Sequence, residues 1–129
     1  MGNISGTTII LRLEGLALAL ACLWLYALFH QSWWLFALLI LAPDLSMLGY
    51  LAGPKVGAAL YNAVHSWVTV VALFFFAFYP GGSDPFLLSL PFILGAHIGI
   101  DRALGFGLKH RTGFKDTHLG RIGRTLRSE

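Results

Sequence analysis

Four long apolar segments joined by short connections constrain the fold of this chain more than any other feature. The segments cover about residues 8–29, 32–50, 56–79 and 85–108. Each is long enough to cross the hydrocarbon core of a bilayer, which takes about 20 residues of helix at roughly 1.5 Å per residue. Backbone groups in lipid must find hydrogen-bond partners within the protein, and a helix provides them. The sequence therefore predicts an integral membrane protein built from four helices.

The composition and the connections agree with a membrane bundle. Hydrophobic residues make up 57% of the 129 and charged residues 12%, with a mean hydropathy of +0.72; soluble domains carry about 25% charged residues. The connections at 30–32, 52–55 and 80–85 are short, which makes consecutive helices antiparallel neighbours. We expect one all-α domain over residues 1–129, an up-down-up-down four-helix bundle with a basic tail at 109–129.

The basic residues predict the orientation of this bundle. Seven of the nine Lys and Arg lie at or after Arg102, and such residues stay on the cytoplasmic side of a membrane. The tail is therefore expected in the cytoplasm, and an even number of spans places the N-terminus there too. Lys55, in the second connection, falls on the same side. We expect the tail to contact membrane lipid rather than nucleic acid, because no nucleic-acid recognition fold is available to present it.

Five ionisable side chains lie within the apolar segments. They are Glu14, Asp44, His65, His97 and Asp101. Counted along the helices, all five lie roughly 9–16 Å from the cytoplasmic ends, within one half of the bilayer. Ionisable residues inside a membrane are costly, usually face the bundle interior and commonly mark a functional site. The sequence predicts a polar chamber to which each helix contributes.

Helical spacing refines this prediction. His97 and Asp101 are four residues apart and hence on one face of a helix, as a metal pair requires. Tyr61 precedes His65 by the same interval, and Asn62 lies beside this stripe. We expect Tyr61 and Asn62 to contact the substrate.

Three further residues bear on how the helices pack. Pro43 cannot donate a backbone hydrogen bond, so it should free the carbonyl of Leu39 and bend the helix just before Asp44. Gly95 and Gly99 lie about 200° around the helix from His97, on a face suited to close helix packing or to self-association.

Imidazole and carboxylate groups together are ligands for divalent zinc, manganese or iron, and helix bundles build such sites from facing helices. The predicted metal ligands are Asp44, His65, His97 and Asp101. Glu14 or Asp44 is the predicted catalytic base, because a metal-activated water needs a carboxylate to take its proton. The alternative is a set of structural polar pairs with no metal.

The tail could complete the site. If it folds back under the bundle, Asp116 and His118 would cap the cytoplasmic opening, and Arg121 and Arg124 would join Arg102 in binding an anion by bidentate hydrogen bonds. The alternative is a basic tail lying on the lipid headgroups.

Four stretches carry a resemblance to a known family. They read LRLEG (11–15), SWWLFALLILAPDLSMLGYLAGPKVGAALYN (32–62), AHIGIDRALGFGLKH (96–110) and GFKDTHLGRIG (113–123). Together they resemble the bacterial membrane proteins of domain of unknown function 4260. The resemblance implies a small four-helix protein of the bacterial cytoplasmic (inner) membrane.

A fainter resemblance concerns chemistry. Pro43-Asp44, then His65-Ser66, then His97 with Asp101 are similar, in that order, to motifs of membrane-bound metal-dependent hydrolase-like proteins. This resemblance implies metal-dependent hydrolysis.

These observations support three functional hypotheses. The first is a membrane-embedded, metal-dependent hydrolase acting on a lipid or other amphiphile at the cytoplasmic leaflet. The second is a small proton- or cation-coupled transporter, since an acid such as Glu14 in the first of four short helices resembles the small multidrug resistance exporters. The third is a structural membrane subunit.

Overall fold

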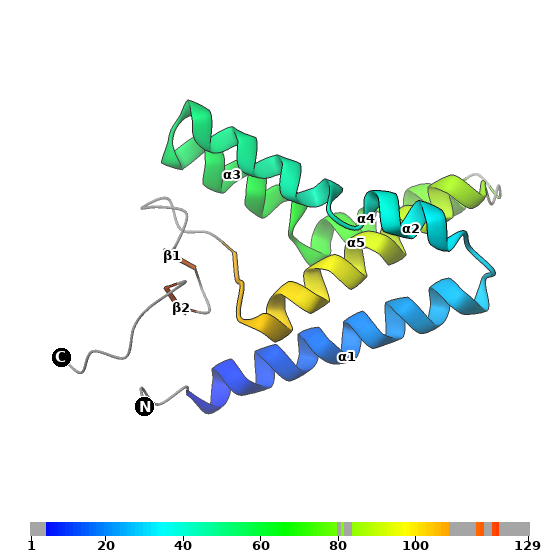
Figure 1. The fold of residues 1–129 in the computed structure, drawn as a ribbon, viewed down its shortest axis with the longest axis horizontal. Coiled ribbons are helices and arrows are strands. Elements are labelled where there is room, and N and C mark those ends of the chain that lie inside the picture. The colour runs from blue at the N-terminus through cyan, green and yellow to red at the C-terminus, as the bar shows by residue number, and fades with distance from the viewer. Residues whose placement is uncertain (1–4, 80, 82–83, 109–115, 118–119, 122–129) are drawn as a thin grey trace.

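The computed structural model describes residues 5–79, 81, 84–108, 116–117 and 120–121. Its ordered elements are almost entirely helical (Figure 1). In chain order they are α1 (Gly6–Leu28), α2 (Trp33–Leu39), the 3₁₀ helix η1 (Ala42–Ala52), α3 (Pro54–Val64), α4 (Trp67–Phe78), α5 (Pro85–Leu104), β1 (Asp116–Thr117) and β2 (Gly120–Arg121). The two short strands pair antiparallel, with Asp116 opposite Arg121.

Three stretches are long and apolar enough to cross a membrane. They are Gly6–Leu28, Trp33–Ala52 and Pro85–Leu104. The bent pair α3 and α4, with 47° between its halves, makes a fourth if it counts as one span. Successive stretches run back and forth along the long axis, so that α1 begins and α5 ends at the same end of the molecule (Figure 1).

The predicted helix at 56–79 is wrong in one respect, because the structure divides it at His65 and Ser66. The hydroxyl of Ser66 accepts a hydrogen bond from the backbone N–H of Val68 and so caps the start of α4. The hydroxyl of Thr69 donates to the carbonyl of Ala63, which the break leaves without a helical donor. Side chains thus satisfy backbone groups that lipid could not.

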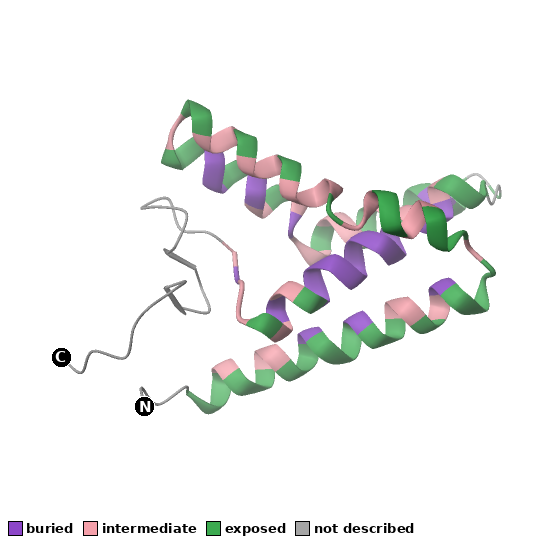
Figure 2. Ribbon diagram, viewed as in Figure 1, coloured by how far each residue is buried: buried purple, intermediate pink, exposed green. Residues whose placement is uncertain are grey.

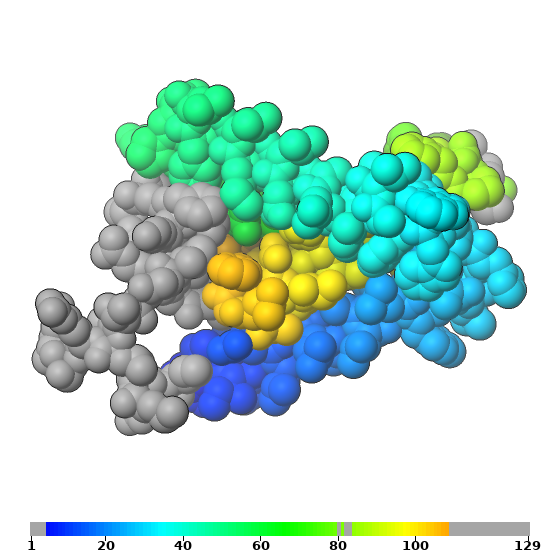
Figure 3. All heavy atoms as spheres, viewed as in Figure 1, coloured from blue at the N-terminus to red at the C-terminus, as the bar shows by residue number. Residues whose placement is uncertain are grey.

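Helix α5 is the most buried of the described helices and lies between α1 on one side and η1 with α3 on the other (Figure 2 and Figure 3). Small residues let α1 approach it closely: an added Cβ at Gly99 would lie 2.5 Å from the carbonyl oxygen of Gly15 and 2.7 Å from the Cβ of Ala19. A Cβ at Gly95 would meet the sulfur of Cys22 at 2.6 Å. The Gly95/Gly99 face predicted for packing or self-association is therefore covered by α1 of the same chain.

Candidate metal centre

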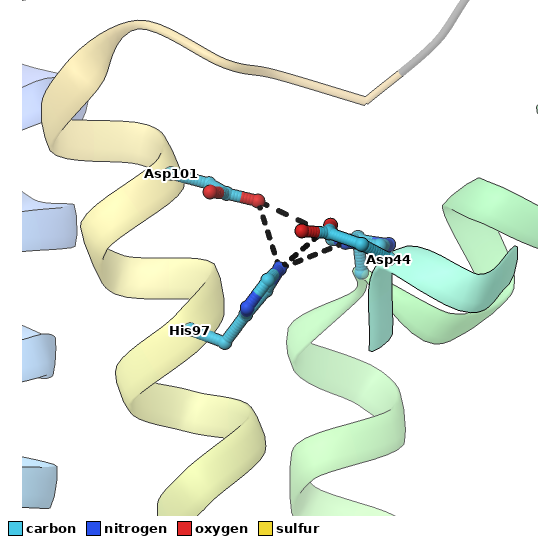
Figure 4. Close-up of side chains that lie close together, drawn as sticks. Asp44, His97 and Asp101 are labelled. Atoms are coloured by element: carbon cyan, nitrogen blue, oxygen red, sulfur yellow. Dashed lines mark hydrogen bonds and ion pairs between the residues drawn. The ribbon is translucent and has the colours of Figure 1, made fainter. Parts of the chain in front are cut away.

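Four of the five predicted ionisable residues come together on the side of α5 that faces η1 and the α3–α4 break. Asp44 lies in the first turn of η1, His65 is the residue that ends α3, and His97 and Asp101 lie one turn apart on α5. Figure 4 shows Asp44 reaching across to the face that His97 and Asp101 share. One ligand atom from each of the four lies within 4.8 Å of all the others, so the group could hold a metal ion.

Three of the four ligand atoms, from Asp44, His65 and His97, lie within 3.3 Å of one another and form a triangle. The Nε2 atoms of His65 and His97 are 3.2 Å apart, and Oδ1 of Asp44 is 3.3 Å from the first and 3.1 Å from the second. Oδ2 of Asp101 lies 3.2 Å from Nε2 of His97 but 3.8 Å from Nε2 of His65. Ligands about 2.1 Å from a shared ion stand roughly 3.0 Å apart in octahedral and 3.4 Å in tetrahedral geometry. The triangle of Asp44, His65 and His97 fits either geometry.

Backbone carbonyls fix the orientation of both imidazoles. Nδ1 of His65 donates to the carbonyl of Tyr61 at 2.9 Å, and Nδ1 of His97 donates to the carbonyl of Ile40 at 2.6 Å. A carbonyl only accepts, so each Nδ1 carries the hydrogen and each neutral ring turns the lone pair of Nε2 toward the centre of the cluster. Metal-binding histidines are commonly held in this way.

Pro43 explains why the carbonyl of Ile40 is available. In a 3₁₀ segment this carbonyl would accept from the residue three positions on, which is Pro43 and has no N–H. The N–H of Asp44, four positions on, instead donates to the carbonyl of Leu41 at 3.1 Å. Because η1 winds as a 3₁₀ helix, the N–H that Pro43 lacks leaves the carbonyl of Ile40 free to accept from His97. The expected release of the Leu39 carbonyl stays a prediction.

A buried arginine holds the chain at the α3–α4 break. The guanidinium of Arg102 donates from one terminal nitrogen to the carbonyl of His65 and from the other to the carbonyl of Phe106, both at 3.0 Å. The residue is only 5% exposed. The ring of Tyr61 stacks on that of His65 with 3.8 Å between centroids. Arg102 and Tyr61 thus support His65 from two directions.

The four ligand atoms need a proton or a metal ion among them. With both Nδ1 atoms committed to carbonyls, two imidazole lone pairs and two carboxylates converge, and none of these groups in its usual neutral-pH form supplies a proton. Acceptors at such distances repel one another unless a proton on one Nε2 or a metal ion lies between them. The cluster is therefore electrostatically suited to a positive ion.

The two carboxylates form the accessible side of the cluster. The side chains of His65 and His97 are 0% and 5% exposed, whereas those of Asp101 and Asp44 are 17% and 34% exposed. A small ion or molecule could therefore reach the four atoms past Asp44.

The other predicted site residues in the described part of the chain are not among the four that converge. Glu14 is on α1, which packs on another face of α5, and it lines a cavity together with Arg102. Asn62 is half-buried on α3. Asp116 and Arg121 are in the paired strands, and His118 and Arg124 lie outside the described residues.

Two supporting residues were not predicted. Ser66 caps the start of α4 and so helps to separate it from α3 at His65. A serine beside a histidine within an apolar run could have indicated this helix break in the sequence. Arg12 donates from Nε to the carbonyl of Ala103 at 2.9 Å, which satisfies one carbonyl at the end of α5. No sequence pattern indicated that contact, because the two residues are 91 positions apart.

Comparison with known proteins places the chain in a family without assigning a reaction. No curated protein and no solved structure matches it. The model of a family described as a domain of unknown function, DUF4260, matches residues 8–122. Because this match covers nearly the whole chain, the protein belongs to the DUF4260 family.

Proposed function

We propose that the chain crosses the bacterial cytoplasmic membrane four times as an up-down-up-down bundle, with both termini in the cytoplasm. The three candidate spans and the bent α3–α4 pair support this count. Seven of the nine Lys and Arg lie at or after Arg102, near the end of α5, and Lys55 lies at the start of α3. Both positions would then be cytoplasmic, as the distribution of basic residues in membrane proteins requires.

We further propose that Asp44, His65 and His97 hold one divalent ion, zinc, manganese or iron, beside the carboxylate of Asp101. The observation that carries this proposal is the convergence of four acceptor atoms within 4.8 Å, with both histidines oriented by carbonyls. Two histidines and one carboxylate with an open position is a ligand set that zinc and iron enzymes use. A divalent ion would balance the two carboxylates and remove the cost of burying them.

The reaction that such a centre supports best is hydrolysis of an amphiphilic substrate at the cytoplasmic leaflet. A divalent ion, when bound, supplies Lewis acidity that lowers the pKa of coordinated water to about 7. Asp44, His65 and His97 would hold the ion. Asp101, whose carboxylate lies 3.8 Å from Nε2 of His65 and is partly exposed, would take up the proton as general base.

Elemental analysis of the full chain purified in detergent tests the metal centre. The protein is produced with zinc, manganese and iron in excess, and about one ion per chain is expected in the wild type. His97→Ala and His65→Ala should each lose it, because each removes a ligand from the centre of the cluster. His30→Asn is the matched control: His30 lies in the first connection with a φ of 53°, which asparagine also tolerates.

Hydrolysis is tested on the metal-loaded protein with short-chain nitrophenyl esters and phosphoesters in mixed micelles. Turnover should disappear in His97→Ala and persist in His30→Asn. Absence of metal from the wild type under these conditions overturns the metal centre. Proton release that depends on Glu14 would then favour the transporter.

A further inference from the structure

A cavity of about 430 Å³ lies between α1, the start of α4 and the end of α5, and none of the four metal-centre residues lines it. Leu11 and Leu18 of α1, Trp67 of α4 and Leu108 after α5 supply apolar walls. Two charged side chains line it as well, Glu14 from α1 and Arg102 from α5. The cavity thus combines a mostly apolar lining with one negative and one positive group.

The two charged groups are not partners of each other. Among the described residues, no cation lies within 4.0 Å of the Glu14 carboxylate, and no hydrogen bond reaches it. Arg102 uses one hydrogen on each terminal nitrogen for the carbonyls of Phe106 and His65. A guanidinium has five N–H groups, so three remain for an anion at the cavity wall.

A carboxylate within a membrane-spanning helix is costly without a cationic partner. The charges of Glu14 and Arg102, unpaired among the described residues, are therefore suited to a ligand that carries one positive and one negative group.

The position of the cavity along the membrane also bears on the ligand. Arg102 lies two residues before the end of α5, about 3 Å along the helix axis. This places the cavity close to the level where lipid headgroups begin.

We propose that this cavity binds the headgroup of a zwitterionic phospholipid, with its ammonium at Glu14 and its phosphate at Arg102. The apolar walls receive the glycerol and the first methylenes, and the acyl chains continue along α1, where Leu18 is 44% exposed. The apolar lining favours a lipid over a free phosphate compound. The proposal stands on the cavity and its two charges and does not depend on the hydrolytic function.

Native mass spectrometry of the full chain in detergent tests this site. The probes are phosphatidylethanolamine and phosphatidylglycerol with matched acyl chains, added in equal amounts. The wild type should retain phosphatidylethanolamine preferentially, because only that headgroup offers an ammonium. Glu14→Gln should reduce this preference about tenfold, the effect of losing one charge-assisted hydrogen bond.

Asp84→Asn is the matched control. Asp84 is an exposed acid that caps α5, and asparagine preserves a cap, so lipid preference should stay as in the wild type. Leu18→Trp fills part of the cavity and should reduce retention of both lipids.

Equal retention of both lipids by the wild type, or an unchanged preference in Glu14→Gln, would overturn the proposal. Equally tight binding of soluble phosphoethanolamine would overturn it too, since the apolar walls would then contribute nothing. Metal content measured on the same samples separates this site from the metal centre: chelation should leave the lipid preference intact, and Glu14→Gln should leave the metal content intact.

Discussion

His97 determines more of the cluster's geometry than any other side chain, because it alone lies within 3.2 Å of all three other ligand groups. Nδ1 donates to the carbonyl of Ile40, and Nε2 lies 3.1–3.2 Å from ligand atoms of Asp44, His65 and Asp101. A ring fixed at one nitrogen cannot rotate away from the other three groups. The hydrogen bonding of this one residue therefore preorganises the cluster for a cation.

The two aspartates are expected to have separable roles. Asp44→Asn should lower metal affinity at least tenfold, because it replaces a charged ligand in the tight triangle with an amide. Asp101→Asn should retain most of the metal and lose most of the turnover, because the base is gone while the triangle remains. Metal titration in detergent, compared with hydrolysis of the same ester, measures both. Parallel loss of metal in the two variants would instead make Asp101 a ligand.

Arg102 is expected to strengthen metal binding indirectly, by holding His65 in position. Lysine has one ammonium and cannot reproduce the guanidinium that reaches the carbonyls of both His65 and Phe106. Arg102→Lys should therefore weaken metal binding about 10–100-fold, as loss of a residue that orients a ligand does elsewhere. The readout is the metal dissociation constant, with Arg12→Lys as a control that removes an arginine contact to α5 outside the cluster. Equal weakening in both variants would point to general loosening of α5.

At the scale of elements, the apolar runs predicted where helices lie but not where they break. Residues 56–79 read as one uninterrupted helix, and the break at His65 depends on contacts that arise only after folding. Arg102, 37 residues away, donates to the carbonyl of His65, and Thr69 donates to that of Ala63. The end of α2 at Leu39, shortly before Asp44, agrees with the local effect of Pro43, whereas no sequence pattern predicted the 3₁₀ winding that follows it.

Pro43 is expected to support metal binding because it has no backbone N–H. Pro43→Ala restores an N–H that can donate to the carbonyl of Ile40, in competition with Nδ1 of His97. The imidazole then loses its fixed orientation, and metal affinity should fall severalfold while α-helical content rises slightly. Metal titration and circular dichroism on the same sample check both effects. Pro54→Ala is the control, since Pro54 begins α3 away from the cluster. Unchanged affinity in Pro43→Ala would show that the carbonyl does not orient His97.

The α1–α5 contact is expected to tolerate no side chain at Gly99. Gly99→Leu would clash with the carbonyl of Gly15 and with Ala19, so the helices must separate. Overpacking of this kind costs about 1–3 kcal/mol. Thermal unfolding in detergent should show a clear loss of stability, whereas Gly6→Leu, with nothing within 4 Å of its added Cβ, should not. Equal stability of the two variants would contradict the close packing.

At the scale of the whole molecule, counting along the sequence predicted a depth for each ionisable group but not its direction around the bundle axis. Asp44, His65, His97 and Asp101 meet, while Glu14, at a similar predicted depth, lies on α1 against a different face of α5. The positions of Gly95 and Gly99 indicated on which side of α5 another helix packs. Gly95 and Gly99 lie about 200° from His97 on a helical wheel, and α1 packs there, so an acid on α1 is directed away from the histidines.

The bent α3–α4 pair leaves two possible paths through the membrane, a broken span or a re-entrant loop, and the side on which α4 ends distinguishes them. In a Cys22→Ala background, single cysteines are introduced as Gln31→Cys, Lys55→Cys and Tyr79→Cys, and intact cells are treated with a membrane-impermeant maleimide. Four spans require Gln31→Cys and Tyr79→Cys to react from outside and Lys55→Cys to react only after lysis. Tyr79 is 79% exposed at the end of α4, so its reactivity reports the side of the membrane rather than burial.

Protection of Tyr79→Cys together with Lys55→Cys would make α3–α4 re-entrant, and α5 would then carry the basic tail to the side opposite Lys55. That arrangement would separate the basic residues that four spans place together, so the positive-inside distribution favours the four-span outcome.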